Sequence, residues 1–325
     1  MIPLVESVTT RANPQIDPSL HTWGWEIVIY LFLGGIVAGI LALTASLELV
    51  RGEKPGSGAL RWIPLVALGL LSVGMLALWL DLAHQFWAWR FYATFQVTSP
   101  MSWGAWILVL LYPTGILLWL GSLENAGRTW LLRKTPAKGK RLLESSMRWA
   151  DSHRGALLKL SLVLGIGLGI YTGMLLGTMP SRLAWNSALL GPLFLVSGIS
   201  TGAAFLLLQK LDGGERKLLV RWDAVAMAAE LVLISLMLTG WATSGAAGRF
   251  AAHDFLGGPY TAVFWSLVVI MGLLVPLAID VIEARRHLAF VAIGPVLILS
   301  GGLALRWILL VAGQESAFRL LSGAR

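Results

Sequence analysis

Eight long apolar segments occupy most of this 325-residue chain and limit what it can fold into. A helix needs about 20 mostly apolar residues to cross a bilayer, and each segment meets that requirement. They lie at 25–49, 62–82, 102–122, 157–177, 189–208, 224–242, 260–280 and 289–311. Hydrophobic residues make up 57% of the chain and charged residues 13%, which is outside the range of soluble domains. The sequence therefore predicts an all-α integral membrane protein with eight transmembrane helices.

Several kinds of redox centre are excluded by composition. The protein has no cysteine, so it cannot form a thiolate-held iron–sulfur cluster or a cysteine zinc site by itself. None of its five histidines lies in the middle of an apolar segment, so we expect no haem held between helices. No P-loop and no metal-type cluster of histidine and carboxylate is apparent, so we expect no metal site.

Lys and Arg are distributed unevenly between the two ends of the predicted helices. The loops after the first, third, fifth and seventh segments hold eighteen, and the polar loop 123–156 contributes more of them than any other loop. Within that loop, Leu142 to Arg154 predicts a small amphipathic helix at the surface. The opposite loops and the N-terminus hold four: Arg11, Arg90, Arg182 and Arg249. Basic loops stay on the cytoplasmic side, so we expect a protein of the inner membrane with both termini outside. The same loops account for the net charge of +8, so this charge does not indicate nucleic-acid binding.

An internal repeat relates the two halves of the sequence. Gly35 and Gly39 in the first segment match Gly198 and Gly202 in the fifth, at an offset of 163 residues. At the same offset Pro113 of the third segment meets Pro276 of the seventh. We therefore expect two four-helix bundles, at 25–177 and 178–311. An outer N-terminal segment, 1–24, precedes them, and an outer C-terminal tail, 312–325, follows.

A polar stretch from Asp81 to Gly104 joins the second and third segments on the predicted outer side. Asp81 and His84 are three residues apart and share one face of a helix end. A histidine that a neighbouring carboxylate orients is a suitable proton acceptor near neutral pH. A quinol releases protons with its electrons, so its site needs such a base together with hydrogen-bond partners. We assign the catalytic roles to Asp81, His84 and Tyr171, with Tyr171 as a hydrogen-bond donor.

Other polar groups lie at a similar depth in the outer half of the predicted bundle. The predicted quinone-binding set is Glu26, Tyr30, Asp81, His84, Tyr171, Thr172 and Arg306. In this set Arg306 supplies a fixed positive charge for a bound anion. These residues also have interpretations without a role in quinone binding. Asp81 and His84 can form an exposed helix terminus, Glu26 can lie in water, and Arg306 can be a snorkelling side chain.

Glu230 lies about two turns inside the sixth segment. A carboxylate at that depth should face the interior of the bundle, where it often belongs to a proton path. Together with Ser200 and Thr201 of the fifth segment, it predicts a path that starts from the cytoplasmic side. Glu48 and Asp280 lie near helix ends instead, and we expect both to be solvated.

The sequence resembles the NrfD/PsrC family of membrane quinone-binding subunits. The shared motifs are Trp23-Gly-Trp-Glu-Ile-Val-Ile-Tyr-Leu-Phe-Leu-Gly-Gly35, Asp81-Leu with Arg90-Phe, Ser99-Pro-Met-Ser-Trp-Gly104, Tyr171-Thr-Gly173 and Gly301-Gly-Leu-Ala-Leu-Arg306. Many members carry a Gly-Arg-Pro-like sequence after the aspartate, where this protein has Ala83-His84-Gln85. The assignment of His84 therefore rests on its chemistry alone.

The resemblance implies two four-helix bundles and a quinone site near the outer face. It also implies a ferredoxin-like iron–sulfur subunit on that face, and beyond it a molybdopterin enzyme or a multihaem cytochrome. We expect the membrane anchor of a bacterial respiratory oxidoreductase, which oxidises menaquinol or reduces quinone, with or without proton translocation. The alternatives are a proton-coupled secondary transporter that uses the repeat and Glu230, and a purely structural anchor.

Overall fold

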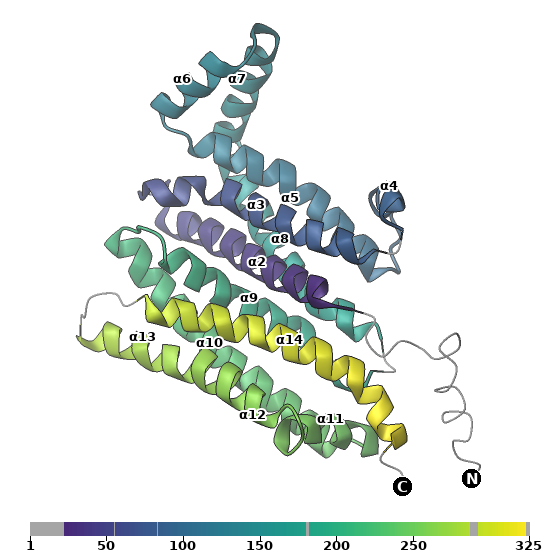
Figure 1. The fold of residues 1–325 in the computed structure, drawn as a ribbon. Helices are drawn as coiled ribbons and strands as arrows, with labels where there is room; N and C mark the ends of the chain where they lie inside the picture. Colours follow the sequence, from purple (N-terminus) through teal and green to yellow (C-terminus); the bar gives the residue numbers. More distant parts are fainter. Residues whose placement is uncertain (1–22, 55, 83, 180–181, 287–291, 323–325) are drawn as a thin grey trace.

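In the computed structural model, the described residues include eight helices long and apolar enough to cross a membrane (Figure 1). The structure describes residues 23–54, 56–82, 84–179, 182–286 and 292–322. The membrane-length helices are α2 (Trp25–Arg51), α3 (Gly58–Asp81), α5 (Pro100–Ser122), α8 (Arg154–Gly177), α9 (Leu190–Leu207), α10 (Gly213–Thr243), the seventh span (Thr261–Ile282) and α14 (Ile293–Ser322). The seventh span joins α12 (Thr261–Val263), a π-helix η3 (Phe264–Leu274) and most of α13 (Val275–Arg286). The prediction of eight membrane-length helices is confirmed.

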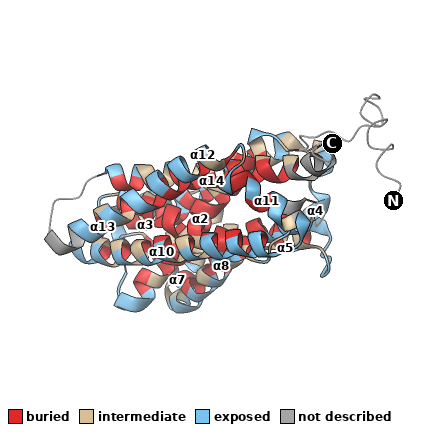
Figure 2. Ribbon diagram, turned by 90° about the horizontal axis from the view of Figure 1, so that it is seen from below, coloured by how far each residue is buried: buried red, intermediate tan, exposed pale blue. Residues whose placement is uncertain are grey.

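Helices α2 and α9 lie side by side in the middle of the bundle (Figure 1). Helix α2 also packs on α3 and α8, whereas α9 packs on α10 and α14. Figure 2 shows buried residues gathered along α2 and α14, while α10 and α13 carry many exposed residues. Those outward faces of α10 remain apolar, with Val225, Val232 and Leu236 all exposed, which is what a hydrocarbon solvent requires.

Glycines bring the backbones of α2 and α9 into direct contact. A Cβ atom at Gly202 would lie 2.6 Å from the carbonyl carbon of Gly39, and one at Gly198 would lie 2.9 Å from the carbonyl oxygen of Gly35. Neither position has room for a side chain, so glycine permits this close approach. These are the residues that the sequence repeat matches, and they meet across a single interface.

The sixth and eighth spans run further than the sequence predicts. Helix α10 begins at Gly213 rather than at residue 224, because Asp212 and Glu215 form a capping box. In that box the Glu215 carboxylate accepts a hydrogen bond from the backbone N–H of Asp212 at 3.2 Å. Helix α14 continues to Ser322, so the expected tail from residue 312 is largely helical.

The extension of α14 ties the end of the described residues to their beginning. The side chain of Gln314 accepts a hydrogen bond from the Trp23 N–H at 2.9 Å and donates one to the Trp23 carbonyl at 3.0 Å. Trp23 and Gly24 are the described residues of the predicted outer segment 1–24, and the rest of it lies outside the described residues. Residues 289–291 of the predicted eighth segment lie outside them too.

The basic loop 123–156 forms two helices, α6 (Asn125–Lys134) and α7 (Ala137–Ser152), where the sequence predicts one. They project from the end of the bundle opposite the one that carries Trp23 and Gln314 (Figure 1). The Asp151 carboxylate of α7 accepts hydrogen bonds from Arg128 of α6 at 2.9 Å and from Lys54 at 3.0 Å. The bond from Arg128, reinforced by Lys54, lowers the pKa of Asp151 to about 2. Asp151 thus fastens the hairpin to the bundle.

The expectation that Glu48 and Asp280 are solvated is wrong. Glu48 is 9% exposed and Asp280 is 5% exposed. Arg154, the first residue of α8, donates from Nη2 to Oε2 of Glu48 at 2.8 Å, and its Nε donates to Oε1. This bidentate ion pair takes the place of water at the basic end of α2.

Candidate functional site

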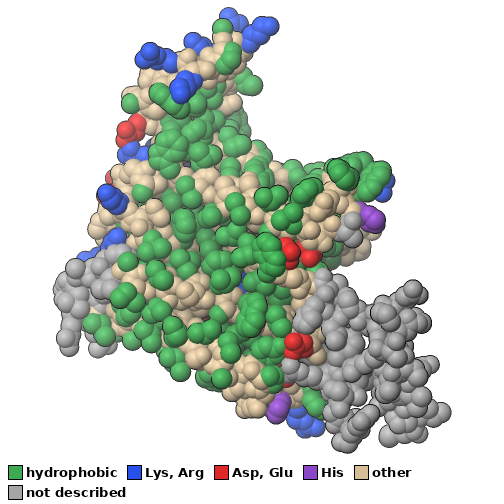
Figure 3. Space-filling view, viewed as in Figure 1, with side chains coloured by type: hydrophobic (Ala, Val, Ile, Leu, Met, Phe, Trp, Pro, Cys, Tyr) green, Lys and Arg blue, Asp and Glu red, His purple; other side chains and the backbone are tan. Residues whose placement is uncertain are grey.

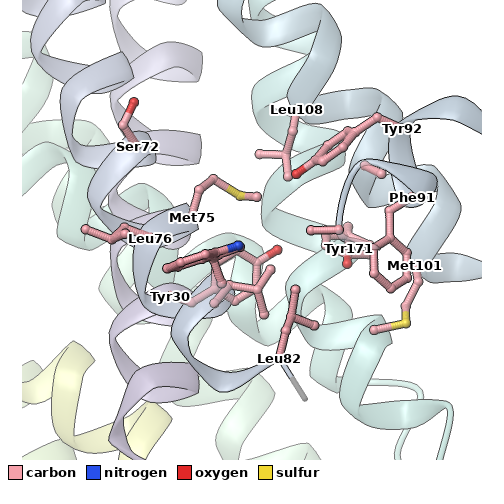
Figure 4. Close-up of a pocket in the computed structure, with 14 residues that line it drawn as sticks. Tyr30, Ser72, Met75, Leu76, Leu82, Phe91, Tyr92, Met101, Leu108 and Tyr171 are labelled. Carbon is pink, nitrogen blue, oxygen red and sulfur yellow. The ribbon is translucent and has the colours of Figure 1, made fainter. Parts of the chain in front are cut away.

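A cavity of about 400 Å³ lies between α2, α3, α5, α8 and the short helix α4 (Arg90–Ala93). Most of its wall is apolar: Met75, Leu76, Leu78, Trp79, Leu82, Ala88, Phe91, Met101, Ala105 and Leu108. The polar side chains in the wall are Ser72 and three tyrosines, which reach it from α2, α4 and α8 (Figure 4). A volume of this size, with few polar groups in an apolar wall, suits a small organic ligand.

Tyr30 of α2 and Tyr171 of α8 are the most deeply buried of the three tyrosines, with exposed fractions of 1% and 9%. Their hydroxyl groups lie close enough for a direct side-chain interaction. The Tyr30 hydroxyl nevertheless makes no hydrogen bond of ordinary geometry to a residue that the structure describes. An unsatisfied buried hydroxyl costs about 1–3 kcal/mol, and a ligand oxygen in the cavity would recover that energy.

The ring of Tyr171 lies against the backbone of α5 at Gly104. A Cβ atom at position 104 would lie 2.5 Å from Cε2 of Tyr171 and closer still to two other ring atoms. No side chain other than hydrogen fits there, so the last residue of the Ser99–Gly104 motif makes the space that Tyr171 occupies. The motif and the tyrosine, far apart in sequence, therefore form one structural unit.

The rest of the Ser99–Gly104 motif folds the preceding loop onto the start of α5. Pro100 is the first residue of the helix, where its missing N–H costs nothing. The Ser102 hydroxyl accepts a hydrogen bond from the Gln96 N–H at 2.9 Å, and the Trp103 indole donates to the Val97 carbonyl at 2.7 Å. These contacts hold Met101, which belongs to the same turn, in the cavity wall.

The loop after α3 closes the cavity at the end of the bundle that carries Trp23 and Gln314. The Trp79 indole donates to the Gln85 carbonyl at 3.2 Å, which draws the loop back so that Leu82 joins the wall. Tyr92 enters from α4, where burial, with a further contribution from Tyr112, raises the pKa of its hydroxyl. Tyr92 therefore stays protonated and can donate a hydrogen bond at neutral pH.

The predicted acid–base residues lie beside this cavity rather than in its wall. Asp81 is the last residue of α3, half-buried, next to the wall residue Leu82. Glu26, in the first turn of α2, interacts electrostatically with Asp81. His84 is exposed in the loop. The structure therefore places an acidic pair near the rim, with His84 further out.

Two members of the predicted quinone-binding set face elsewhere. Thr172 is fully buried and donates to the Gly169 carbonyl of its own helix at 2.8 Å. Arg306 is also fully buried, which excludes snorkelling. It lies between α2, α9 and α14, where it donates to the Leu31 carbonyl at 3.1 Å and to the Ser197 hydroxyl at 3.1 Å. Arg306 is therefore separate from the tyrosine-lined cavity.

A second, much smaller cavity adjoins Arg306. It measures about 10 Å³, the space of roughly one water molecule, and its polar wall residues are Ser197, Ser200, Thr201 and Glu230. Glu230 is 2% exposed and interacts electrostatically with Arg306. The three residues of the predicted proton path thus meet in one place.

A fourth polar group, Asp223, lies two turns before Glu230 on α10 and is not among the residues that the sequence pattern predicts. Asp223 is fully buried and accepts a hydrogen bond from the Ser200 hydroxyl at 2.7 Å. Its seven-residue spacing from Glu230 places both carboxylates on one face of a helix, and this spacing is the sequence pattern from which Asp223 could be predicted.

The family described as "Polysulphide reductase, NrfD" matches residues 13–317 of the protein. The protein belongs to this family. This NrfD-family protein is 28% identical to one of the chains of the polysulfide reductase of Wolinella succinogenes, over 90% of its own length and 94% of the relative. It is 32% identical to protein NrfD of Escherichia coli, with 90% and 95% covered. It is 26% identical to one of the subunits of the selenate reductase of Mesobacillus selenatarsenatis, with 90% and 74% covered. The resemblance drawn from the motifs is confirmed.

Proposed function

We propose that this protein is the quinone-reactive membrane subunit of a respiratory oxidoreductase, and that the cavity between Tyr30 and Tyr171 holds the quinone ring. The observation that carries the proposal is Tyr30, which lines an apolar cavity of about 400 Å³ and whose buried hydroxyl makes no hydrogen bond of ordinary geometry to a described residue. The relatives from polysulfide reductase and selenate reductase are named as parts of multi-subunit reductases, which supports a role as a subunit of such a complex.

The residues of the cavity fit a quinol. Tyr30 and Tyr171, on different helices, hold the ring oxygens through hydrogen bonds, and the apolar walls exclude water from the ring. Leu76, Phe91 and Met101 are exposed wall residues, so the rim is open to an apolar molecule that arrives from the hydrocarbon. When bound, a quinol supplies two electrons and two protons. Asp81 and Glu26 hold the released protons near the rim, and His84 passes them to water.

Electrons leave through a partner, because a protein without cysteine holds no iron–sulfur cluster of its own. We place a ferredoxin-like iron–sulfur subunit at the end of the bundle that carries Trp23, Gln314 and the cavity. A molybdopterin catalytic subunit or a multihaem cytochrome follows it. In this arrangement the protein lies in the inner membrane, with that end toward the periplasm and the basic end toward the cytoplasm.

The test uses the native complex, purified in detergent. Reduced menaquinol is added, and reduction of the iron–sulfur clusters is followed by EPR in the wild type and in the double variant Tyr30→Phe, Tyr171→Phe. Removing two hydrogen bonds to the ring should slow cluster reduction by about 30-fold while the subunits still co-purify. Tyr260→Phe removes a similar hydroxyl in the other half of the bundle, where it donates to Glu315, and should have no effect. Equal rates in all three proteins would place the quinone elsewhere.

We also propose that the two halves, 25–177 and 178–311, are repeats with different roles. Their packing supports this: α2 contacts α3 and α8, just as α9 contacts α10 and α14. The first half holds the tyrosine-lined cavity, and the second half holds the series Asp223, Ser200, Glu230. That series provides a proton path from the basic end toward Arg306.

Proteoliposomes test the proton path. Glu230→Gln should lower the number of protons translocated per quinol and leave cluster reduction by quinol within about twofold of the wild type. Glu144→Gln, an exposed carboxylate on α7, is the matched control. A lower rate of quinol oxidation with unchanged proton stoichiometry would remove Glu230 from the path. Proton flux driven by a solute without quinol would favour the transporter instead.

A further inference from the structure

A tryptophan-lined groove lies at the basic end of the bundle, away from both cavities. Its volume is about 220 Å³, and it is lined by Trp62 of α3, Trp119 of α5, Leu123, and Gly127, Trp130 and Leu131 of α6. Trp62 and Trp130 are half exposed, at 50% and 55%. Two of its walls belong to membrane-length helices and the third to the projecting hairpin, so the groove lies where the bundle meets the membrane surface.

Trp119, in the wall of the groove, carries an unsatisfied polar group. The indole nitrogen of Trp119 is buried and has no hydrogen-bond partner among the residues that the structure describes. An indole N–H can only donate, so it requires an acceptor oxygen. An occupant that turns the Trp119 ring toward the groove must therefore combine apolar chains with an oxygen acceptor.

Positive charge lies along the hairpin that forms one wall of the groove. From Asn125 to Ser152 the hairpin carries seven Lys and Arg against two acidic residues. Figure 3 shows Lys and Arg gathered over α6 and α7 at this end of the molecule. Arg133 and Lys134 form the last turn of α6, and the Lys134 ammonium lies 4.6 Å from the centre of the Trp130 ring. The acid at this rim, Glu124, is paired with Arg61.

We propose that this groove binds an anionic phospholipid, independently of any quinone chemistry. One acyl chain lies between the tryptophans, an ester oxygen accepts the Trp119 N–H, and the phosphate lies beside Arg133 and Lys134. Basic pockets between membrane helices favour anionic headgroups, and each nearby cation strengthens binding about fivefold. The lipid holds α6 against α3 and α5 in the leaflet at the basic end of the bundle.

The full-length protein, in its native complex, is stripped of lipid in detergent and titrated with phosphatidylglycerol while bound lipid is counted by native mass spectrometry. Phosphatidylcholine with the same acyl chains and inorganic phosphate are the comparison probes. One phosphatidylglycerol should be retained per protein molecule. The double variant Arg133→Gln, Lys134→Gln should bind it about 30-fold more weakly.

The matched control is the double variant Lys138→Gln, Arg148→Gln, which removes the same charge from exposed positions on α7, outside the groove. It should bind phosphatidylglycerol within about twofold of the wild type. Equal weakening by both double variants would mean diffuse attraction by the hairpin and would overturn the site.

A second pair of variants tests the groove itself. Trp130→Ala should lose the retained lipid, whereas Trp149→Ala, an exposed tryptophan on α7, should keep it. Equal retention of phosphatidylcholine, or displacement of the lipid by millimolar inorganic phosphate, would show that no phospholipid site exists here. Lipid retention and cluster reduction by quinol are separate measurements, so a negative result for the lipid site does not contradict the proposed quinone site, and the reverse also holds.

Discussion

Replacing Gly104 by alanine adds one methyl group, and we expect it to disable the cavity by moving Tyr171. The new Cβ would lie 2.5 Å from Cε2 of the Tyr171 ring, whereas ordinary contacts between carbon atoms are about 3.5–4.0 Å. The ring must therefore shift by at least about 1 Å. The shifted ring displaces the bound quinol as well as removing a hydrogen bond, and a misplacement of that size costs about 100-fold in rate, more than the loss of the two hydroxyls alone.

The expected result is a rate of cluster reduction by menaquinol about 100-fold lower in Gly104→Ala, in a complex that still assembles. The assay is stopped-flow or freeze-quench EPR on the purified complex. Overpacking should lower the free energy of unfolding by about 1–3 kcal/mol, partly offset by the better helix propensity of alanine. Gly240→Ala on α10 is the matched control, because a Cβ there meets nothing within 4 Å. It should leave the rate unchanged.

A double-mutant cycle separates an effect through Tyr171 from a general distortion of α5. In a Tyr171→Ala background the ring is gone, so Gly104→Ala should cause no further loss of rate. Full activity of Gly104→Ala in the wild-type background would refute the argument that Tyr171 must stay where it is. An additional 100-fold loss in the Tyr171→Ala background would show that Gly104 acts on something else.

Three further predictions concern charged groups. Arg154→Ala leaves the Glu48 carboxylate buried without its ion pair, so it should lower the free energy of unfolding by about 3–5 kcal/mol, measured as a lower Tm. Asp151 has a folded pKa of about 2, below its usual value, so its stabilisation of the hairpin is present above about pH 4 and is lost as the pH falls through 2. Pepsin should therefore cut the α6–α7 hairpin faster toward pH 2, and Asp151→Asn should be cut fast at every pH that is tested. Arg306→Gln should reduce the yield of assembled complex, because buried carbonyl groups lose their donor; normal assembly with selective loss of quinol turnover would instead assign Arg306 to the quinone site.

The sequence predicts the depth of polar residues in the bilayer but not the side of the helix on which they act. The sequence predicts both Tyr171 and Arg306 in the outer half, in one site. The structure places the Tyr171 ring against Gly104 of α5. Arg306 instead lies against Leu31 of α2, on the other side of helix α2 from the Tyr171 ring. Helices that are apolar all round have no polar face from which their orientation can be read.

The tyrosine-lined cavity was only partly predictable for a related reason. Tyr30 and Tyr171 are predictable as site residues because a hydroxyl inside an apolar segment requires a hydrogen-bond partner. Tyr92 lies among the aromatic residues of the outer loop, and Ser72 donates to the Leu68 carbonyl of its own helix, as serines in membrane helices often do. Neither pattern distinguishes a cavity residue from an ordinary one.

Helix α2 connects the two buried sites, and its sequence explains how it can. Tyr30 lines the large cavity, while the carbonyl of the next residue, Leu31, accepts a hydrogen bond from Arg306 beside the small one. Gly35, one turn later, leaves the space that the Arg306 guanidinium fills. A rotation of α2 that carried Tyr30 out of its cavity would therefore also break the bond to Arg306. A helix that holds two sites in this way needs a rigid position, and the contact of Gly39 with α9 supplies it.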